Sequence, residues 1–148
     1  MRSGKKIGVI VLAVLVTLVS GGALSRVWAD NCNTGFFTGL NLTDEEGNPV
    51  TNLAATSVAA ASPLPAYCNV TGTLYPMINF QVALPTTTAW NGRFYMAGGG
   101  GFNGSIPSLT TGLSLNYATA GTDSGHTGTP LDASFAYNPP TTATLTRR

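Results

Sequence analysis

Alternating apolar and polar positions along the chain are clearest between residues 66 and 123. From Ile78 to Leu84 every second residue is apolar until Pro85 ends the run, which predicts a strand with one buried and one wetter face. Residues 67–74 form another β-rich segment, closed by Pro76. We expect a further strand at 93–97, and the Asn91-Gly92 turn before it predicts an antiparallel hairpin with the strand at 78–84.

The pattern changes after this predicted hairpin. Residues 107–115 predict a short helix, and residues 117–123 predict a second buried strand. A strand, loop, helix and strand in this order open a βαβ unit, so the fold class expected is α/β. In such a unit the loops at the carboxyl ends of parallel strands line the site, and the glycine run at 98–101 would lie there.

The two ends of the exported region are less regular. Residues 33–65 are rich in Ala, Ser, Thr and Asn, with an acidic turn at 44–49, and they predict surface loops with one short strand or helix. Residues 139–148 have no periodicity and predict a disordered tail. We therefore expect one domain at residues 30–138.

The N-terminus predicts a signal peptide over residues 1–29. Three basic residues precede an apolar run, and small residues follow it up to Ala29, which is the order of a secretory signal. We expect cleavage after Ala29, with Ala23 as a second site, and a secreted or periplasmic protein. The alternative is an uncleaved anchor, because the run reaches about 18 residues if it is extended to Leu24.

Charge excludes one class of partner. Cleavage would remove four basic residues and leave three arginines against six carboxylates, a net charge of −3. Nothing in this composition could neutralise a row of phosphates, so nucleic acid is not expected as a partner. With one histidine and two cysteines, no spacing of metal ligands is recognisable, and the acidic residues at 44–46 are interpreted as a solvated turn.

The two cysteines, Cys32 and Cys68, both follow the predicted cleavage site. An even number of cysteines in an exported chain predicts one disulfide. The alternative is that each pairs with a cysteine of another chain or of a further segment.

Four consecutive glycines, at 98–101, follow the strand at 93–97. A backbone without Cβ atoms leaves its N–H groups accessible, and such a loop can hold an oxyanion in serine esterases. A phosphate-binding loop would require a Gly-Lys-Ser ending, which Gly101-Phe102-Asn103 does not provide. A tight turn or a flexible linker is the structural alternative.

Several segments together resemble a known family. They are Cys68-Asn69-Val70-Thr71-Gly72, the strand end Leu84-Pro85, Trp90-Asn91-Gly92-Arg93-Phe94, the run from Gly98 to Gly104, Tyr117-Ala118-Thr119 and Thr122-Asp123-Ser124-Gly125-His126. In this order and spacing, the chain resembles the N-terminal portion of tannases and feruloyl esterases. These are exported α/β-hydrolases that cut esters of plant phenolic acids.

The resemblance implies an incomplete α/β-hydrolase sheet and a serine ester hydrolase, for which we expect no cofactor. It assigns the oxyanion hole to Gly99, Gly100 and Gly101. Phe102 is a candidate contact for a phenolic ester substrate, and the alternative is that it is a packing residue beside the glycine loop. The family's Cys-Ser-x-Gly-Gly nucleophile segment, its acid and its later histidine are not found in these 148 residues. We therefore expect the chain by itself to have no turnover, and no membrane partner after signal cleavage.

The single histidine, His126, lies close to Asp123 and Ser124. Three residues in one short segment cannot easily converge as a catalytic triad. We instead expect Asp123 and His126 to hydrogen-bond the backbone of a turn, and Arg93 could pair with Asp123.

Two alternatives to the esterase interpretation stay open. The chain could be a small exported binding module that uses Trp90, Tyr95 and Phe102 as a platform. It could also be a truncated gene product that does not function.

Overall fold

The computed structural model of the protein describes residues 31–136, and the predicted signal peptide and tail lie outside this region. Within it, no helix is long and apolar enough to cross a membrane. The predicted anchor alternative concerns residues that are not described.

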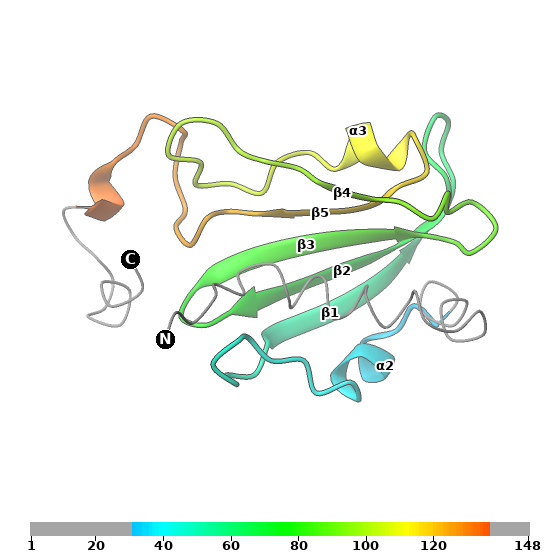
Figure 1. The fold of residues 1–148 in the computed structure, drawn as a ribbon, viewed down its shortest axis with the longest axis horizontal. Coiled ribbons are helices and arrows are strands. Elements are labelled where there is room, and N and C mark those ends of the chain that lie inside the picture. Colours follow the sequence, from blue (N-terminus) through cyan, green and yellow to red (C-terminus); the bar gives the residue numbers. More distant parts are fainter. Residues whose placement is uncertain (1–30, 137–148) are drawn as a thin grey trace, which may run out of the picture.

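A five-stranded mixed sheet forms the centre of the described region, in the order β1-β2-β3-β5-β4 (Figure 1). The first four strands in this order pair antiparallel, whereas β4 pairs parallel with β5. The strands are β1 (Thr51–Val58), β2 (Tyr67–Leu74), β3 (Ile78–Pro85), β4 (Phe94–Met96) and β5 (Ala118–Thr122). The described region is thus a mixed sheet of five strands with few helices.

The predicted hairpin between residues 78–84 and 93–97 is wrong. β3 pairs with β2 in a hairpin whose last pair is Leu74 with Ile78, and β5 lies between β3 and β4. The reason is burial: β5 consists of small residues and is covered on both faces, whereas Tyr95 and Met96 of β4 are exposed. A strand buried on both faces takes a central position, and a more exposed one lies at the edge.

The predicted βαβ unit is confirmed by β4, the helix α3 (Thr110–Leu113) and β5. Phe94 lies opposite Ala118 in the parallel register. The helix packs closely on the strands, because a Cβ atom at Gly112 would overlap the side chain of Thr119 and lie 2.8 Å from Tyr95 Cδ1. The carboxyl ends of β4 and β5 therefore point to the same end of the sheet.

Both faces of the sheet carry a small hydrophobic core. Ala83 packs with Leu109 and Leu113 on one face, and Val82 packs against Phe37 and its neighbours on the other. The alternation from Ile78 to Leu84 thus predicted a strand correctly, but not its wetter face. The segment that contains α3 covers that face and leaves Ala83 fully buried.

The N-terminal segment is more ordered than predicted, since it contains both the helix α2 (Thr34–Thr38) and the strand β1. The Oδ1 atom of Asn33 accepts a hydrogen bond from the N–H of Phe36 at 2.8 Å and caps the helix. β1 has little apolar alternation, and its pairing with β2 outweighs the weak local signal.

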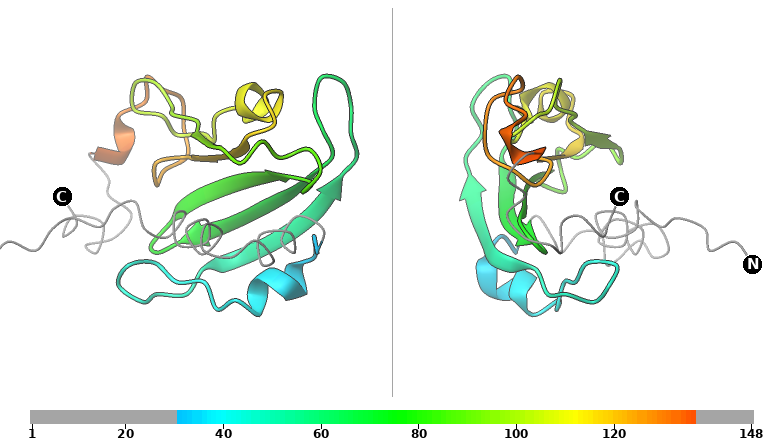
Figure 2. Two further views of the ribbon diagram at one scale, coloured as in Figure 1. Left: turned by 45° about the vertical axis from the view of Figure 1, so that its right-hand side comes forward. Right: turned by 90° about the vertical axis from the view of Figure 1, so that its left-hand side faces the viewer.

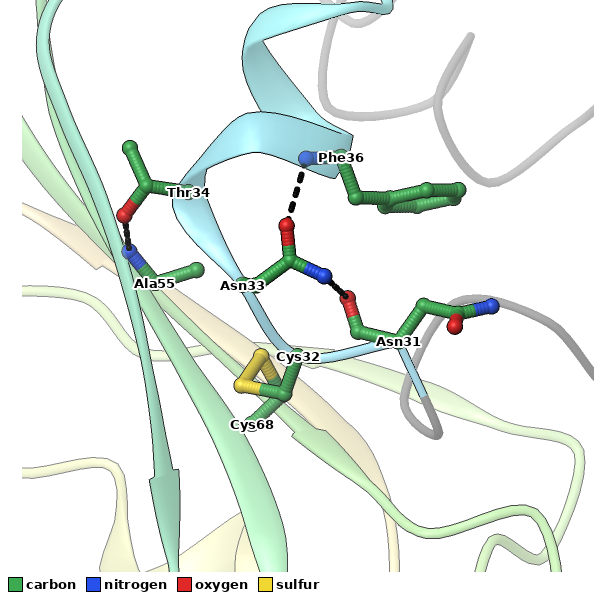
Figure 3. The surroundings of a disulfide bond; sticks show 7 residues. All are labelled: Asn31, Cys32, Asn33, Thr34, Phe36, Ala55 and Cys68. Atoms are coloured by element: carbon green, nitrogen blue, oxygen red, sulfur yellow. Dashed lines mark hydrogen bonds between the residues drawn. A yellow bond between two sulfur atoms is a disulfide. The ribbon is translucent and has the colours of Figure 1, made fainter.

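A disulfide joins Cys32 to Cys68, as predicted, and fixes the start of α2 to β2 (Figure 3). Beside it, Thr34 Oγ1 accepts a hydrogen bond from the N–H of Ala55 at 3.0 Å, on the outer edge of β1. Figure 2 shows that α2 and the segment with α3 lie at opposite edges of the sheet. One edge of the sheet is thus covered by a helix.

Candidate active site at the glycine loop

The glycine loop, residues 98–101, follows β4 directly. Ala97 is buried, and its N–H donates to the carbonyl of Ala120 at 2.7 Å, so β4 is held in register up to the start of the loop. All four glycines are exposed. Figure 1 places the loop at the same end of the sheet as the segment that follows β5.

The backbone on the far side of the loop is fully engaged. The N–H of Phe102 donates to Pro130 O at 2.9 Å, that of Asn103 to Gly100 O at 3.0 Å, and that of Gly104 to Asp123 O at 3.2 Å. By contrast, no N–H from Gly98 to Gly101 donates a hydrogen bond to any residue between 31 and 136. Four consecutive exposed glycines at this end of the sheet therefore carry N–H groups without a partner in the described region.

Two of the glycines are required by their surroundings. A Cβ atom at Gly99 would overlap the side-chain amide of Asn103, and one at Gly101 would overlap the carbonyl of Pro130. Gly101 also has φ +60, which side chains disfavour. No atom lies within 4 Å of a Cβ atom built at Gly98 or Gly100. Gly99 and Gly101 are thus closely packed against neighbouring atoms, whereas Gly98 and Gly100 have free space where a side chain would begin.

Asp123, which follows β5, is 4% exposed and has three hydrogen bonds to its carboxylate. They come from the backbone N–H of Asn79 at 3.0 Å, its side-chain amide at 2.7 Å and the N–H of Gly125 at 2.9 Å. The predicted bond from a turn backbone to Asp123 is confirmed. Sequence reasoning missed Asn79, which no motif distinguishes from the other polar residues of the strands.

Asp123 does not pair with Arg93. Arg93 precedes β4 and Asp123 follows the parallel β5, so they lie at opposite ends of these strands. The guanidinium of Arg93 instead donates to the hydroxyl of Tyr117 at 3.4 Å.

His126 lies beside this turn and is 9% exposed. Its ring stacks on Phe135 with centroids 4.1 Å apart, and its buried Nε2 has no hydrogen-bond partner in the described structure. The prediction that His126 hydrogen-bonds the turn backbone is therefore wrong. Because the carboxylate of Asp123 is held by Asn79 and Gly125, and Ser124 Oγ accepts from Asn103 at 2.9 Å, these three neighbours do not form a triad.

Asp132 lies near His126, and its hydrogen bonds lower its pKa. The backbone N–H of Ser134 donates to it at 2.8 Å and, with the hydroxyl of the same residue, lowers its pKa below the ordinary value. His126 lowers the pKa of Asp132 to a smaller extent. Within residues 31–136, no group of three His, Cys, Asp or Glu residues could hold a metal ion.

Phe102 is 51% exposed next to the glycine loop, and its ring meets that of Phe135 edge-on at a centroid distance of 6.1 Å. Trp90 lies at the amino end of β4, where its indole N–H donates to Arg93 O at 2.9 Å. Trp90 and Phe102 are thus at opposite ends of β4 and do not form one platform, as the binding-module alternative would require.

The family model for tannase and feruloyl esterase matches residues 62–147, which is more than half of the chain. The chain belongs to the tannase and feruloyl esterase family. The matched residues include the glycine loop and the two residues packed against it, Asn103 and Pro130. The match confirms the resemblance inferred from the motifs.

Individual proteins are also similar to this chain in sequence. A mono(2-hydroxyethyl) terephthalate hydrolase from Piscinibacter sakaiensis is 40% identical over 91 residues, covering 49% of this chain and 15% of that protein. An uncharacterized esterase from Xanthomonas campestris pv. campestris is 32% identical over 138 residues, covering 86% of this chain and 24% of that protein.

One solved structure has a similar fold. A tannin acyl hydrolase from Aspergillus niger superposes with a TM-score of 0.51 at 23% identity, covering 71% of this chain and 23% of that one. The chain therefore spans less than a quarter of the length of these three proteins.

Proposed function

We propose that this chain provides the oxyanion-binding part of a serine carboxylic ester hydrolase of the tannase and feruloyl esterase type. The observation that carries the proposal is the row of unpaired N–H groups on the exposed glycines of the loop at the carboxyl end of β4. In this proposal the sheet is the N-terminal part of an α/β-hydrolase sheet, and the loop lies where such folds bind their ligands.

The reaction explains why unpaired donors are needed. When a serine attacks the ester carbonyl, the carbonyl oxygen becomes an oxyanion. The N–H groups of Gly99, Gly100 and Gly101 would donate hydrogen bonds to this oxyanion. Each such donor contributes about 3 kcal/mol to the stability of the transition state. The serine's proton would pass to a histidine and then to the leaving alcohol. We infer that the serine, the histidine and the orienting acid lie outside these 148 residues.

The substrates we propose are esters of phenolic or other aromatic acids. Phe102 follows the glycine loop, is half exposed, and is supported at its edge by Phe135, so it could contact an aromatic acyl group. Two of the similar proteins have names that specify esters of this kind. No cofactor or nucleic acid is part of the proposal, and the disulfide is typical of a secreted or periplasmic protein.

A chimera tests the proposal. Residues 62–147 of this chain, which the family model matches, would replace the corresponding residues of the terephthalate hydrolase. We expect the chimera to hydrolyse mono(2-hydroxyethyl) terephthalate and methyl ferulate, and the separate 148-residue chain to hydrolyse neither. Turnover by the separate chain would contradict the inferred location of the nucleophile.

Gly100 allows the oxyanion donor itself to be removed. No atom lies within 4 Å of a Cβ atom at Gly100, so Gly100→Ala has room, whereas Gly100→Pro also removes the N–H. In the chimera we expect Gly100→Pro to lower kcat by about 10²-fold or more and Gly100→Ala to have a much smaller effect. Equal kcat values for the two variants would contradict the role of this N–H.

A further inference from the structure

Asn103 joins the glycine loop to the end of β5. It is 8% exposed, and its side-chain amide donates to Thr122 O and to Ser124 Oγ, both at 2.9 Å. Its own backbone N–H donates to Gly100 O at 3.0 Å and closes the turn at the end of the loop. One buried side chain thus connects the candidate oxyanion donors to the end of β5, the second strand of the βαβ unit.

The side chain of Asn103 also packs directly against the backbone of Gly99. A Cβ atom at Gly99 would overlap Oδ1 and Cγ of Asn103, so the glycine backbone rests directly on this amide. The backbone of Asn103 has φ +60, a conformation that asparagine tolerates better than most residues. Asn103 therefore has a left-handed backbone conformation and donates two hydrogen bonds from its side-chain amide. Its uncharged Oδ1 atom lies against Gly99.

We propose that Asn103 is a positioning residue that pre-orders the N–H groups of Gly99, Gly100 and Gly101 for an oxyanion. This inference rests on the proposed function. Glycine loses more conformational freedom on ordering than any other residue. Without Asn103, that loss would occur when the anion binds rather than when the protein folds, and the anion would bind more weakly.

The chemistry of the position predicts which replacements fail. Alanine removes both donors and the support under Gly99. Aspartate keeps the shape of the side chain, but when ionised it cannot donate to Thr122 O or Ser124 Oγ. It also places a negative charge beside the site where the oxyanion would bind.

Nitrate binding measured by NMR tests the proposal without catalysis. The ¹⁵N-labelled 148-residue chain would be titrated with sodium nitrate at constant ionic strength, because nitrate stays an oxyanion at all working pH values. We expect the Gly99, Gly100 and Gly101 amide signals to shift saturably. Asn103→Ala and Asn103→Asp are expected to weaken this binding about tenfold at pH 7, the effect of shifting roughly one residue's backbone ordering onto binding.

The Asn103→Asp variant provides a readout that a merely structural role would not change. Its nitrate affinity should recover as the pH falls below about 3.9, the ordinary pKa of an aspartate, because the neutral carboxyl can donate and no longer repels the anion. The matched control is Asn69→Ala, which removes a hydrogen bond of 2.6 Å from Gln81 within the sheet. This control should leave nitrate binding unchanged.

The outcomes separate the two proposals. If the glycine amides of the unmodified chain do not shift saturably, the oxyanion role of the loop fails. If they do, but both Asn103 variants bind nitrate equally well, or the affinity of Asn103→Asp does not depend on pH, the positioning role is overturned. Loss of amide dispersion throughout the sheet in both variants would also overturn it, since Asn103 would then be needed for the fold itself.

Discussion

Removing the disulfide is the perturbation whose cost follows most directly from the structure. The Cys32–Cys68 bond closes a loop with a sequence separation of 36. In the chain-entropy model, a closed loop of this length lowers the entropy of the unfolded chain enough to stabilise the folded protein by about 4 kcal/mol at 25 °C. We expect reduction to lower the free energy of unfolding by that amount.

Packing adds to the cost when the sulfur atoms are also removed. Cys68 is 1% exposed and lies in the core with Phe37 and Val70. The double variant Cys32→Ala/Cys68→Ala leaves an unfilled space there, so it should be somewhat less stable than the reduced, unmodified chain. The free energy of unfolding of small domains is only about 5–15 kcal/mol. Either change would therefore remove a large part of the stability of this protein.

Urea unfolding followed by circular dichroism measures these differences. The oxidised chain, the chain reduced with dithiothreitol and the double variant would be compared by their midpoints and slopes. A loss below about 1 kcal/mol on reduction would refute the loop-closure reasoning. Equal stability of the oxidised and reduced chains, with a loss only in the double variant, would assign the effect to core packing rather than to the cross-link.

Two other perturbations are predicted by local geometry. Gly101→Ala should lower the free energy of unfolding by about 1–2 kcal/mol, because alanine disfavours the positive φ and its Cβ atom would overlap Pro130 O. Gly98→Ala, which meets no atom within 4 Å, is the control and should be nearly neutral in the same unfolding assay. For Asp132, the folded pKa is lower than the unfolded one, so its contribution to stability is present above the unfolded pKa and is lost as the pH falls through the folded pKa. Ser134→Pro removes the N–H donor, and a carboxyl ¹³C titration should then give a pKa for Asp132 closer to its ordinary value; an unchanged pKa would contradict this cause.

The positions of β2 to β5 could be predicted from the sequence, but that of β1 and the order of the strands could not. Periodicity and Pro85 located β3 correctly, and Pro76 marked the end of β2. The Asn91-Gly92 signal, however, indicated a turn without indicating its partner. The side-chain amide of Asn91 donates to Leu115 O at 2.6 Å, so this turn attaches to the connection between α3 and β5 rather than forming a hairpin.

The candidate site shows the same division. A run of four glycines is visible in the sequence, and the family motifs around it are specific enough to indicate its role. The residues that hold the loop in place cannot be predicted from the sequence. Pro130 O accepts from the N–H of Phe102, and Thr122 O accepts from the side chain of Asn103, and only the fold brings these segments together. Asn103 belongs to the glycine motif, but its side-chain contacts are to Thr122 and Ser124 at the end of β5, and periodicity does not predict that turn.

The hydrogen bond between Thr34 Oγ1 and the N–H of Ala55 has a consequence for how the protein should be handled. Unpaired strand edges are templates for association between chains. Here α2 occupies the outer edge of β1, and the disulfide keeps it there. A reducing buffer that frees α2 would uncover that edge, so preparations kept oxidised should stay monodisperse longer than those stored with a thiol.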